Sequence, residues 1–351
     1  MTSTVHQRPG VYSSYDASSI VGSGNSAKTI GIAAAAVSGD KNAVTYITSY
    51  ETGVSAFGLD GGTPGMSTLL KLAFLNGATR IAAVAVGDGD YASAFALLAQ
   101  EEDIGIMLCD SAELTVQQAL RDSVHAASEA RRERIAIVGS SAETVAQLTA
   151  RAAEINSERT ILVGPDVLDT GGNTMPSVFA AAALAGVIAS SSDPAIPING
   201  AELSGLGGIG ETYDDNDIDA LVTCGVTPLE CVAGAVSAVR GITTRTLTGG
   251  ASDTTWREMT TILIVDDVIP TIRSSLRAKF SRSKNTEQNR GAIRSCVIVE
   301  LENFVSKEII DGYDSVTVRA DTDDPTTCVV EFSFAVAHGL NRIYLTAHIT
   351  V

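Results

Sequence analysis

The fold is decided by the stretch from Arg80 to Val138, which reads RIAAVAVGDGDYASAFALLAQEEDIGIMLCDSAELTVQQALRDSVHAASEARRERIAIV. It holds three short apolar runs, at residues 80–86, 104–109 and 134–138, and each run is continuous rather than alternating. Strands that are apolar on both faces are usually covered by helices on both sides. The stretch therefore predicts strands of a mostly parallel sheet in a protein of the α/β class.

The same pattern extends to both sides of this stretch. Further apolar runs occupy residues 29–36, 44–48 and 160–164. Between the runs, apolar residues recur at helical spacing and form single stripes. The stripes consist of Met66, Leu69, Leu70 and Ala73, then Val116, Ala119, Leu120, Val124 and Ala127, then Val145, Leu148, Ala152 and Ile155. We interpret residues 29–240 as one doubly wound α/β domain.

The pattern changes after residue 240. Residues 242–247 alternate like a strand, and a long helical stripe then runs from Ile262 to Phe280 with Pro270 inside it. A proline in that place predicts a helix that is kinked or restarted. A second helix is expected near residues 286–304, followed by strands at 316–318 and 330–336. Residues 241–336 are therefore predicted to form a separate α+β domain.

Both ends of the sequence predict extended arms. Residues 1–28 are polar, rich in serine and glycine, and interrupted by Pro9-Gly10, a composition that cannot form a core of its own. Residues 337–351 end in a strand pattern in which Ile343, Leu345, Ile349 and Val351 share one face. A strand at the end of a chain offers an unpaired edge to a partner.

Charge limits the class of partner. The chain of 351 residues carries a net charge of −17, which argues against nucleic acid as the main partner. One window, residues 270–294, is nevertheless basic, with a single acidic residue, Glu287. Its basic residues are Arg273, Arg277, Lys279, Arg282, Lys284, Arg290 and Arg294. The window is either a solvated helix face or a docking surface for an acidic protein.

No motif supports a cofactor, metal or catalytic site. Residues 205–210 fit G-x-G-x-x-G, but no apolar strand precedes them and acidic residues follow, which disfavours a nucleotide. Asp215, Asp217 and Asp219 alternate as in a calcium loop but lack its turn glycine and closing glutamate, so a helix-capping turn is the better interpretation. The four histidines accompany no nucleophile motif, and the five cysteines show no C-x-x-C spacing.

No segment predicts membrane insertion or secretion. The longest apolar run, residues 178–189, is 12 residues long, which is too short to span a bilayer. The first residues lack the basic and apolar regions of a signal peptide.

A series of short motifs stands in order along the chain. They are Arg8-Pro9-Gly10-Val11-Tyr12, Ser192-Asp193-Pro194-Ala195-Ile196-Pro197-Ile198-Asn199, Gly225-Val226-Thr227-Pro228, Val239-Arg240-Gly241-Ile242-Thr243-Thr244-Arg245-Thr246, Thr255-Trp256-Arg257-Glu258, Lys284-Asn285-Thr286-Glu287 and Ala292-Ile293-Arg294-Ser295. The ordered set resembles the contractile phage tail sheath family, in particular the short sheaths of Mu-like phages and tailocins. After Tyr12 the chain departs from many relatives, with Ser-Ser-Tyr-Asp in place of Ile-Glu-Glu.

The resemblance implies a structural protein and not an enzyme. It implies a middle domain similar to the subtilisin-like sheath domain without catalytic residues, and an inner domain built from the C-terminal third. It further implies stacked hexameric rings that surround a tail tube and contract to drive the tube through a cell envelope. The expected partners are other copies of the chain, the tube, the baseplate and the tail-terminator protein, with no cofactor, nucleic acid or membrane. The expected place is the virion tail, assembled in the cytoplasm of a bacterial host.

Two surfaces are predicted to carry assembly. Residues 9–17 of one subunit, which include Pro9, Gly10, Val11 and Tyr12, are expected to join residues 343–351 of a neighbour in one small sheet, since main-chain hydrogen bonds give affinity. Arg273, Arg277, Lys279, Arg282 and Lys284 are expected to dock on the tube or an adjacent subunit. Two alternatives stay open at this point: the sheath of a bacteriocin or other injection device, and an α/β nucleotide-binding or hydrolytic enzyme.

Overall fold

The computed structural model describes residues 28–322 and 324–341. Its centre is an eight-stranded sheet of order β11-β10-β6-β5-β4-β1-β3-β2. The parallel strands are β1 (Thr29–Ala35), β3 (Ile81–Val86), β4 (Ile104–Cys109), β5 (Ile135–Gly139), β6 (Thr160–Gly164) and β10 (Val226–Val232). The two edge strands, β2 (Thr45–Ile47) and β11 (Ala235–Ala238), are antiparallel. The predicted α/β class and mostly parallel sheet are confirmed.

Helices cover both faces of the sheet. One face packs on α1 (Tyr50–Phe57), α2 (Met66–Leu75) and α6 (Val178–Ser190), and the other on α3 (Tyr91–Leu98), α4 (Leu114–Glu129), α5 (Val145–Ile155) and α7 (Asp215–Thr223). Successive residues of a strand point to opposite faces. Accordingly, Ile30 and Ile32 belong to the core on the face covered by α2 and α6, and Ala33 belongs to the core on the opposite face. The continuous apolar runs are thus explained by burial on two sides.

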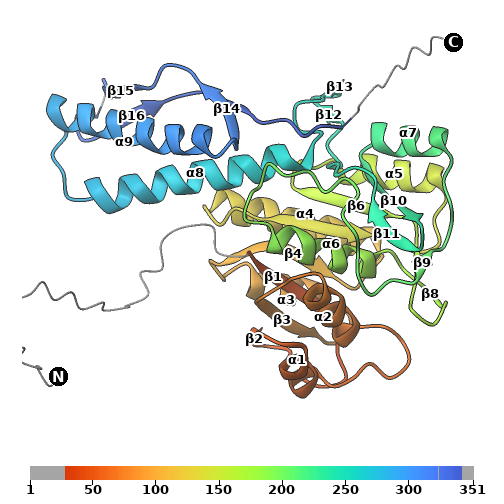
Figure 1. The fold of residues 1–351 in the computed structure, drawn as a ribbon. Coiled ribbons are helices and arrows are strands. Elements are labelled where there is room, and N and C mark those ends of the chain that lie inside the picture. Colours follow the sequence, from red (N-terminus) through yellow and green to blue (C-terminus); the bar gives the residue numbers. More distant parts are fainter. Residues whose placement is uncertain (1–27, 323, 342–351) are drawn as a thin grey trace, which may run out of the picture.

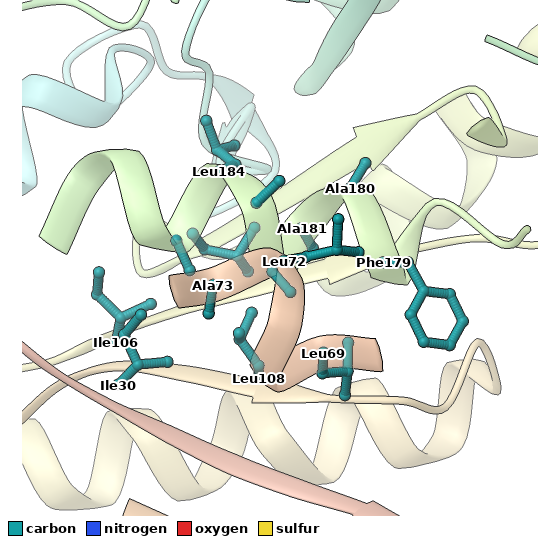
Figure 2. Close-up of a cluster of buried hydrophobic side chains, with 14 of the residues drawn as sticks. Ile30, Leu69, Leu72, Ala73, Ile106, Leu108, Phe179, Ala180, Ala181 and Leu184 are labelled. Atoms are coloured by element: carbon teal, nitrogen blue, oxygen red, sulfur yellow. The ribbon is translucent and has the colours of Figure 1, made fainter. Parts of the chain in front are cut away.

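The apolar run at 178–189 forms the buried helix α6. Figure 2 shows Ala181 of this helix on the side toward Leu72 and Ala73 of α2, with sheet residues such as Ile106 beneath. The two helices touch at Gly186, where a Cβ atom would lie 2.5 Å from the carbonyl oxygen of Ala73. Among the described helices, none combines the length and the apolar character needed to cross a bilayer.

A helical hairpin extends from the sheet (Figure 1). It consists of α8 (Met259–Phe280) and α9 (Glu287–Ser306). The start of α8 contributes Met259, Ile262 and Leu263 to the core of the sheet. From Ile264 onward, α8 packs instead on α9 in a separate core. One continuous helix therefore joins the two cores, and the limits 29–240 and 241–336 stay a prediction.

Short strands complete the fold. Two two-stranded sheets accompany α9: β14 (Ile310–Tyr313) pairs with β17 (Phe334–Val336), and β15 (Thr317–Ala320) pairs with β16 (Cys328–Glu331). Beside the large sheet lie a three-stranded sheet of β7 (Val167–Leu168), β8 (Thr174–Met175) and β9 (Gly208–Ile209), and a hairpin of β12 (Leu247–Thr248) and β13 (Ala251–Ser252).

Helix α8 runs through Pro270 without a restart, which excludes one of the two predicted alternatives, and Val268 and Ile272 on either side are held in the core with α9. Two local predictions need correction. Residues 242–247 do not form one strand, since the hydroxyl groups of Thr243 and Thr244 bond to the carbonyls of Trp256 and Ser157. The predicted strand at 330–336 is broken into β16 and β17, which pair with different partners.

Candidate functional site

The topological switch of the sheet lies at β1, which is hydrogen-bonded to β3 on one side and β4 on the other. In open α/β sheets, ligands bind at such a point, outside the carboxyl ends of the strands. In this protein Asp110, directly after β4, lies at this switch point. One of its carboxylate oxygens accepts a hydrogen bond of 2.8 Å from the Ala35 N–H, and the other accepts one of 2.6 Å from the Tyr91 hydroxyl. The carboxylate therefore ties the end of β1 to the start of α3.

A second carboxylate fills the neighbouring helix terminus. The N-terminus of α2 touches the end of β1, because a Cβ on Gly65 would lie 2.9 Å from the Ala35 carbonyl oxygen. Asp60 accepts hydrogen bonds there from the N–H groups of Gly65, Ser67 and Thr68, at 2.8–3.1 Å. Burial opposes ionisation of Asp60, but these bonds and the Thr68 hydroxyl outweigh it and lower its pKa. A helix terminus that could hold a phosphate thus holds the chain's own anion.

Charged side chains join the hairpin to the opposite, amino edge of the sheet. Arg159, just before β6, forms two hydrogen bonds with Asp266 of α8, at 2.7 and 2.9 Å. Glu133, two residues before β5, accepts a hydrogen bond of 2.5 Å from Arg273. Lys28, just before β1, faces Asp266 and Asp267. We call Lys28, Glu133, Arg159, Asp266 and Arg273 the junction cluster.

Burial has the larger effect on the pKa values of Asp266 and Lys28, and pairing has the larger effect on that of Glu133. Burial raises the pKa of Asp266, against the opposing effect of Arg159, and it lowers the pKa of Lys28, against that of Asp266 and Asp267. For Glu133, burial is outweighed by the bond from Arg273, so that its pKa falls. Each buried charge is tolerated because an oppositely charged partner offsets part of the free energy lost on dehydration. The cluster is suited to fixing α8 on the sheet.

The structure divides the predicted docking residues into two groups. Arg273 belongs to the junction cluster, where it pairs with Glu133, and its docking role stays a prediction. Arg277, Lys279, Arg282 and Lys284 are exposed near the tip of the hairpin. The Lys279 ammonium lies 3.9 Å from a carboxylate oxygen of Glu300. In the part of the chain that is described, Arg277, Arg282 and Lys284 enter no salt bridge.

Glycine and aspartate motifs have local structural roles. Gly207 runs so close to β7 that a Cβ would lie 2.2 Å from the Asp169 carbonyl oxygen. Asp214 caps α7 and forms a capping box with Asp217, as expected for a helix-capping turn. Asp90 likewise caps α3 through the Ser93 N–H. These motifs stabilise turns, and within residues 28–322 and 324–341 no group of three or more metal-binding side chains could hold an ion.

The remaining candidate nucleophiles and bases are dispersed. The His125 ring lies 2.9 Å from the Ser157 hydroxyl, while His6 and His348 lie outside the described residues. All five cysteines are free. Burial raises the pKa of the Cys109 thiol to about 12, which leaves it protonated at neutral pH.

Two family models match the chain in succession. The phage tail sheath protein central domain matches residues 85–244, and the phage tail sheath C-terminal domain matches residues 251–350. This chain belongs to the phage tail sheath family. The tail sheath protein of Bacillus phage SP01 is 30% identical to it over 256 residues, which are 71% of this chain. This sheath-family chain spans 43% of the length of that curated relative.

Solved sheath proteins share the fold of this family member. The sheath tail protein of Desulfitobacterium hafniense has a TM-score of 0.71 at 11% identity, covering 93% of this chain and 100% of the other. The contracted helical sheath of the anti-feeding prophage gives 0.72 at 16% identity, with 98% and 99% covered. The contracted sheath of an extracellular contractile injection system, PVC, gives 0.73 at 15% identity, with 99% of each chain covered.

The residues predicted to take part in strand exchange lie outside the described residues. They are Pro9, Gly10, Val11, Tyr12, Ile343, Leu345, Ile349 and Val351. The structure does locate Lys28 and Asn341, the described residues from which the N-terminal and C-terminal segments continue. Lys28 lines a cavity with Pro197, and Asn341 accepts a hydrogen bond of 2.7 Å from Asn199. Both ends of the described chain therefore meet the same loop, residues 191–201.

Sequence reasoning missed the junction cluster. Its pairs join residues 107 and 140 positions apart, a separation that local patterns do not detect. One signal was present, because Asp266 and Asp267 interrupt an otherwise apolar helical stripe. Buried carboxylates in such a place require cationic partners.

Proposed function

We propose that this protein is the structural subunit of a contractile tail sheath. In this proposal it polymerises as stacked hexameric rings around a tail tube and contracts to drive the tube through a cell envelope. The observation that carries the proposal is the succession of two sheath domain models along one chain. The role is mechanical and not enzymatic, which fits a switch point occupied by Asp60 and Asp110.

Strand exchange between subunits is the first part of the mechanism. A two-stranded sheet is at best marginally stable alone and gains from further strands. The sheets β14–β17 and β15–β16 each have two strands in the described residues, so their outer edges can accept others. We assign residues 9–17 and 343–351 of neighbouring copies to such additional strands. These links keep the lattice connected while the globular parts slide.

Contraction is the second part. It requires two packings of the same subunits, with the extended one trapped and the contracted one lower in free energy. The junction cluster supports this by holding the hairpin and the sheet together as one body. Free energy then comes from interfaces between subunits, and no nucleotide is needed.

Docking at the hairpin tip is the third part. Arg277, Lys279, Arg282 and Lys284 are exposed on a protein whose net charge is −17. We assign them to an acidic surface of the tube or of an adjacent subunit. Exposed ion pairs contribute about 0–1 kcal/mol each, so they can be broken one after another during contraction.

The proposed partners and place follow from this role. The partners are other copies of the chain, the tail tube, the baseplate and the tail-terminator protein, and the place is a virion tail assembled in the cytoplasm of a bacterial host. A second candidate is the sheath of a bacteriocin or another injection device. It is favoured by the similar folds of the anti-feeding prophage and PVC sheaths.

Electron microscopy of the expressed protein tests the proposal. The full chain should form hollow tubes in negative stain, and a chain that lacks residues 343–351 should remain a folded monomer by circular dichroism and gel filtration. A matched control, Thr346→Ala with His348→Ala, keeps the backbone and the apolar face and should still form tubes. Tubes from the truncated chain would refute strand exchange, whereas a full chain that never assembles would refute the sheath role itself.

A further inference from the structure

An apolar cavity of about 130 Å³ lies where α6, loop 191–201 and the start of α8 meet. Its walls include Ile188 and Ile198, both 5% exposed, and Leu263, 4% exposed. Ile196 also lines it but is 57% exposed. An apolar cavity of about 150 Å³ can bind a molecule as large as benzene. This cavity therefore has room for an aliphatic side chain.

The position of Lys28 indicates which segment can reach the cavity. Lys28 lines it and is the first described residue, so residues 1–27 depart from its edge. Between Tyr12 and Thr29, the only aliphatic residues larger than alanine are Ile20 and Val21. They are linked to Lys28 by Gly-Ser-Gly-Asn-Ser-Ala, six small residues that can span at most about 20 Å. The pair is thus confined to the neighbourhood of the cavity, at a high effective concentration.

We propose that the Ile20–Val21 pair of the same chain docks at this cavity, with one of its two aliphatic side chains inside, and anchors the root of the N-terminal arm on loop 191–201. Residues 1–19 then leave the subunit from a fixed point. The proposal concerns the isolated subunit and does not depend on sheath assembly.

The other chain end is a competing occupant. Ile343 is two residues beyond Asn341, which is hydrogen-bonded to Asn199. However, none of the described residues 337–341 lines the cavity, and Gly339 packs on the ring of Pro197. Ile343 also belongs to the apolar face that it shares with Leu345, Ile349 and Val351, whereas no other role uses Ile20 and Val21.

Disulfide trapping in a dilute, monomeric sample tests the proposal. In a Cys231→Ser background, which removes the exposed cysteine, Val21→Cys is combined with Ile196→Cys in the full chain. Mild oxidation should give an intrachain 21–196 disulfide, identified by peptide mass mapping, in several times the yield of the matched pair Ser14→Cys with Ile196→Cys. Equal yields, or a 21–196 disulfide found only between chains, would overturn the proposal. A faster disulfide from Ile343→Cys with Ile196→Cys would assign the cavity to the other end.

Filling the cavity provides an independent measurement. Ala201→Leu places extra volume in it and should displace Ile20 and Val21. Thermolysin, which cleaves before large aliphatic residues, should then cut at residues 20–21 several times faster than in the unmodified chain. Val299→Leu, at an exposed position of α9, is the control and should leave the rate unchanged. Unchanged cleavage in a folded Ala201→Leu variant contradicts the proposal.

Discussion

Arg159 and Asp266 are joined by two hydrogen bonds, Nη1 to Oδ2 at 2.7 Å and Nη2 to Oδ1 at 2.9 Å. Their side chains are only 12% and 7% exposed. This two-pronged geometry is the strongest form of an arginine–carboxylate pair. It connects the amino end of β6 to the middle of α8, so that sheet and hairpin are held at one point by paired charges.

Removing one member of this pair should destabilise the fold strongly. Asp266→Ala leaves the Arg159 guanidinium without its carboxylate in a buried place and leaves the Lys28 ammonium facing Asp267 alone, and breaking a buried pair typically costs about 3–5 kcal/mol. Urea unfolding followed by circular dichroism measures the change. Arg80→Ala, which breaks the exposed pair with Asp103, is the control and should cost less than about 1 kcal/mol. Equal effects of both variants would show that the pair contributes little.

Two glycines should respond to alanine in opposite directions. A Cβ on Gly139 would lie 2.2 Å from the Val178 nitrogen and 2.4 Å from the Ser177 carbonyl carbon, and backbone atoms at the start of α6 cannot withdraw cheaply. Gly139→Ala should therefore cost about 3 kcal/mol or more. A Cβ on Gly291, inside α9, meets nothing within 4 Å, so Gly291→Ala should stabilise by about 0.5–1 kcal/mol. Thermal unfolding checks both signs.

The effect of Asp60 on stability should depend on pH. Because the folded pKa of Asp60 lies below its unfolded value of about 3.9, its contribution is present above that pH and is lost as the pH falls through the folded pKa. Asp60→Asn should cost about 1 kcal/mol at pH 7, the usual size of a helix-capping effect. The difference between the two proteins in urea unfolding should shrink below about pH 4. A difference of constant size from pH 7 to pH 3 would contradict this role.

Local patterns predicted the large elements because those elements follow local rules. The helix α5 has both its apolar stripe and its capping box of Thr144 and Gln147 in one short stretch, and α9 begins after the cap Thr286. The strands were legible since burial on two faces makes them apolar throughout.

Patterns failed where partners distant in sequence decide the structure. The alternation at 242–247 resembled a strand, but the Thr244 hydroxyl bonds to the carbonyl of Ser157, 87 positions away. Arg273 looked like a free surface charge because its partner Glu133 is 140 positions away. The sequence therefore indicated a basic surface without revealing which of its residues already have partners.

This division of the basic residues makes a charge-reversal experiment selective. Replacing Arg277, Lys279 and Arg282 together by glutamate changes exposed side chains and spares Arg273, so the unfolding free energy of the monomer should change little. If these residues dock on an acidic surface, the triple variant should fail to form extended sheath on tubes when it is co-expressed with tube protein, because like charges then face each other. Electron microscopy of the particles measures this. Lys71→Glu, at an exposed site on α2, controls for the added negative charge and should still assemble. Normal extended tails from the triple variant would remove the hairpin tip from the docking surface, whereas loss of assembly in both variants would point to net charge and not to this tip.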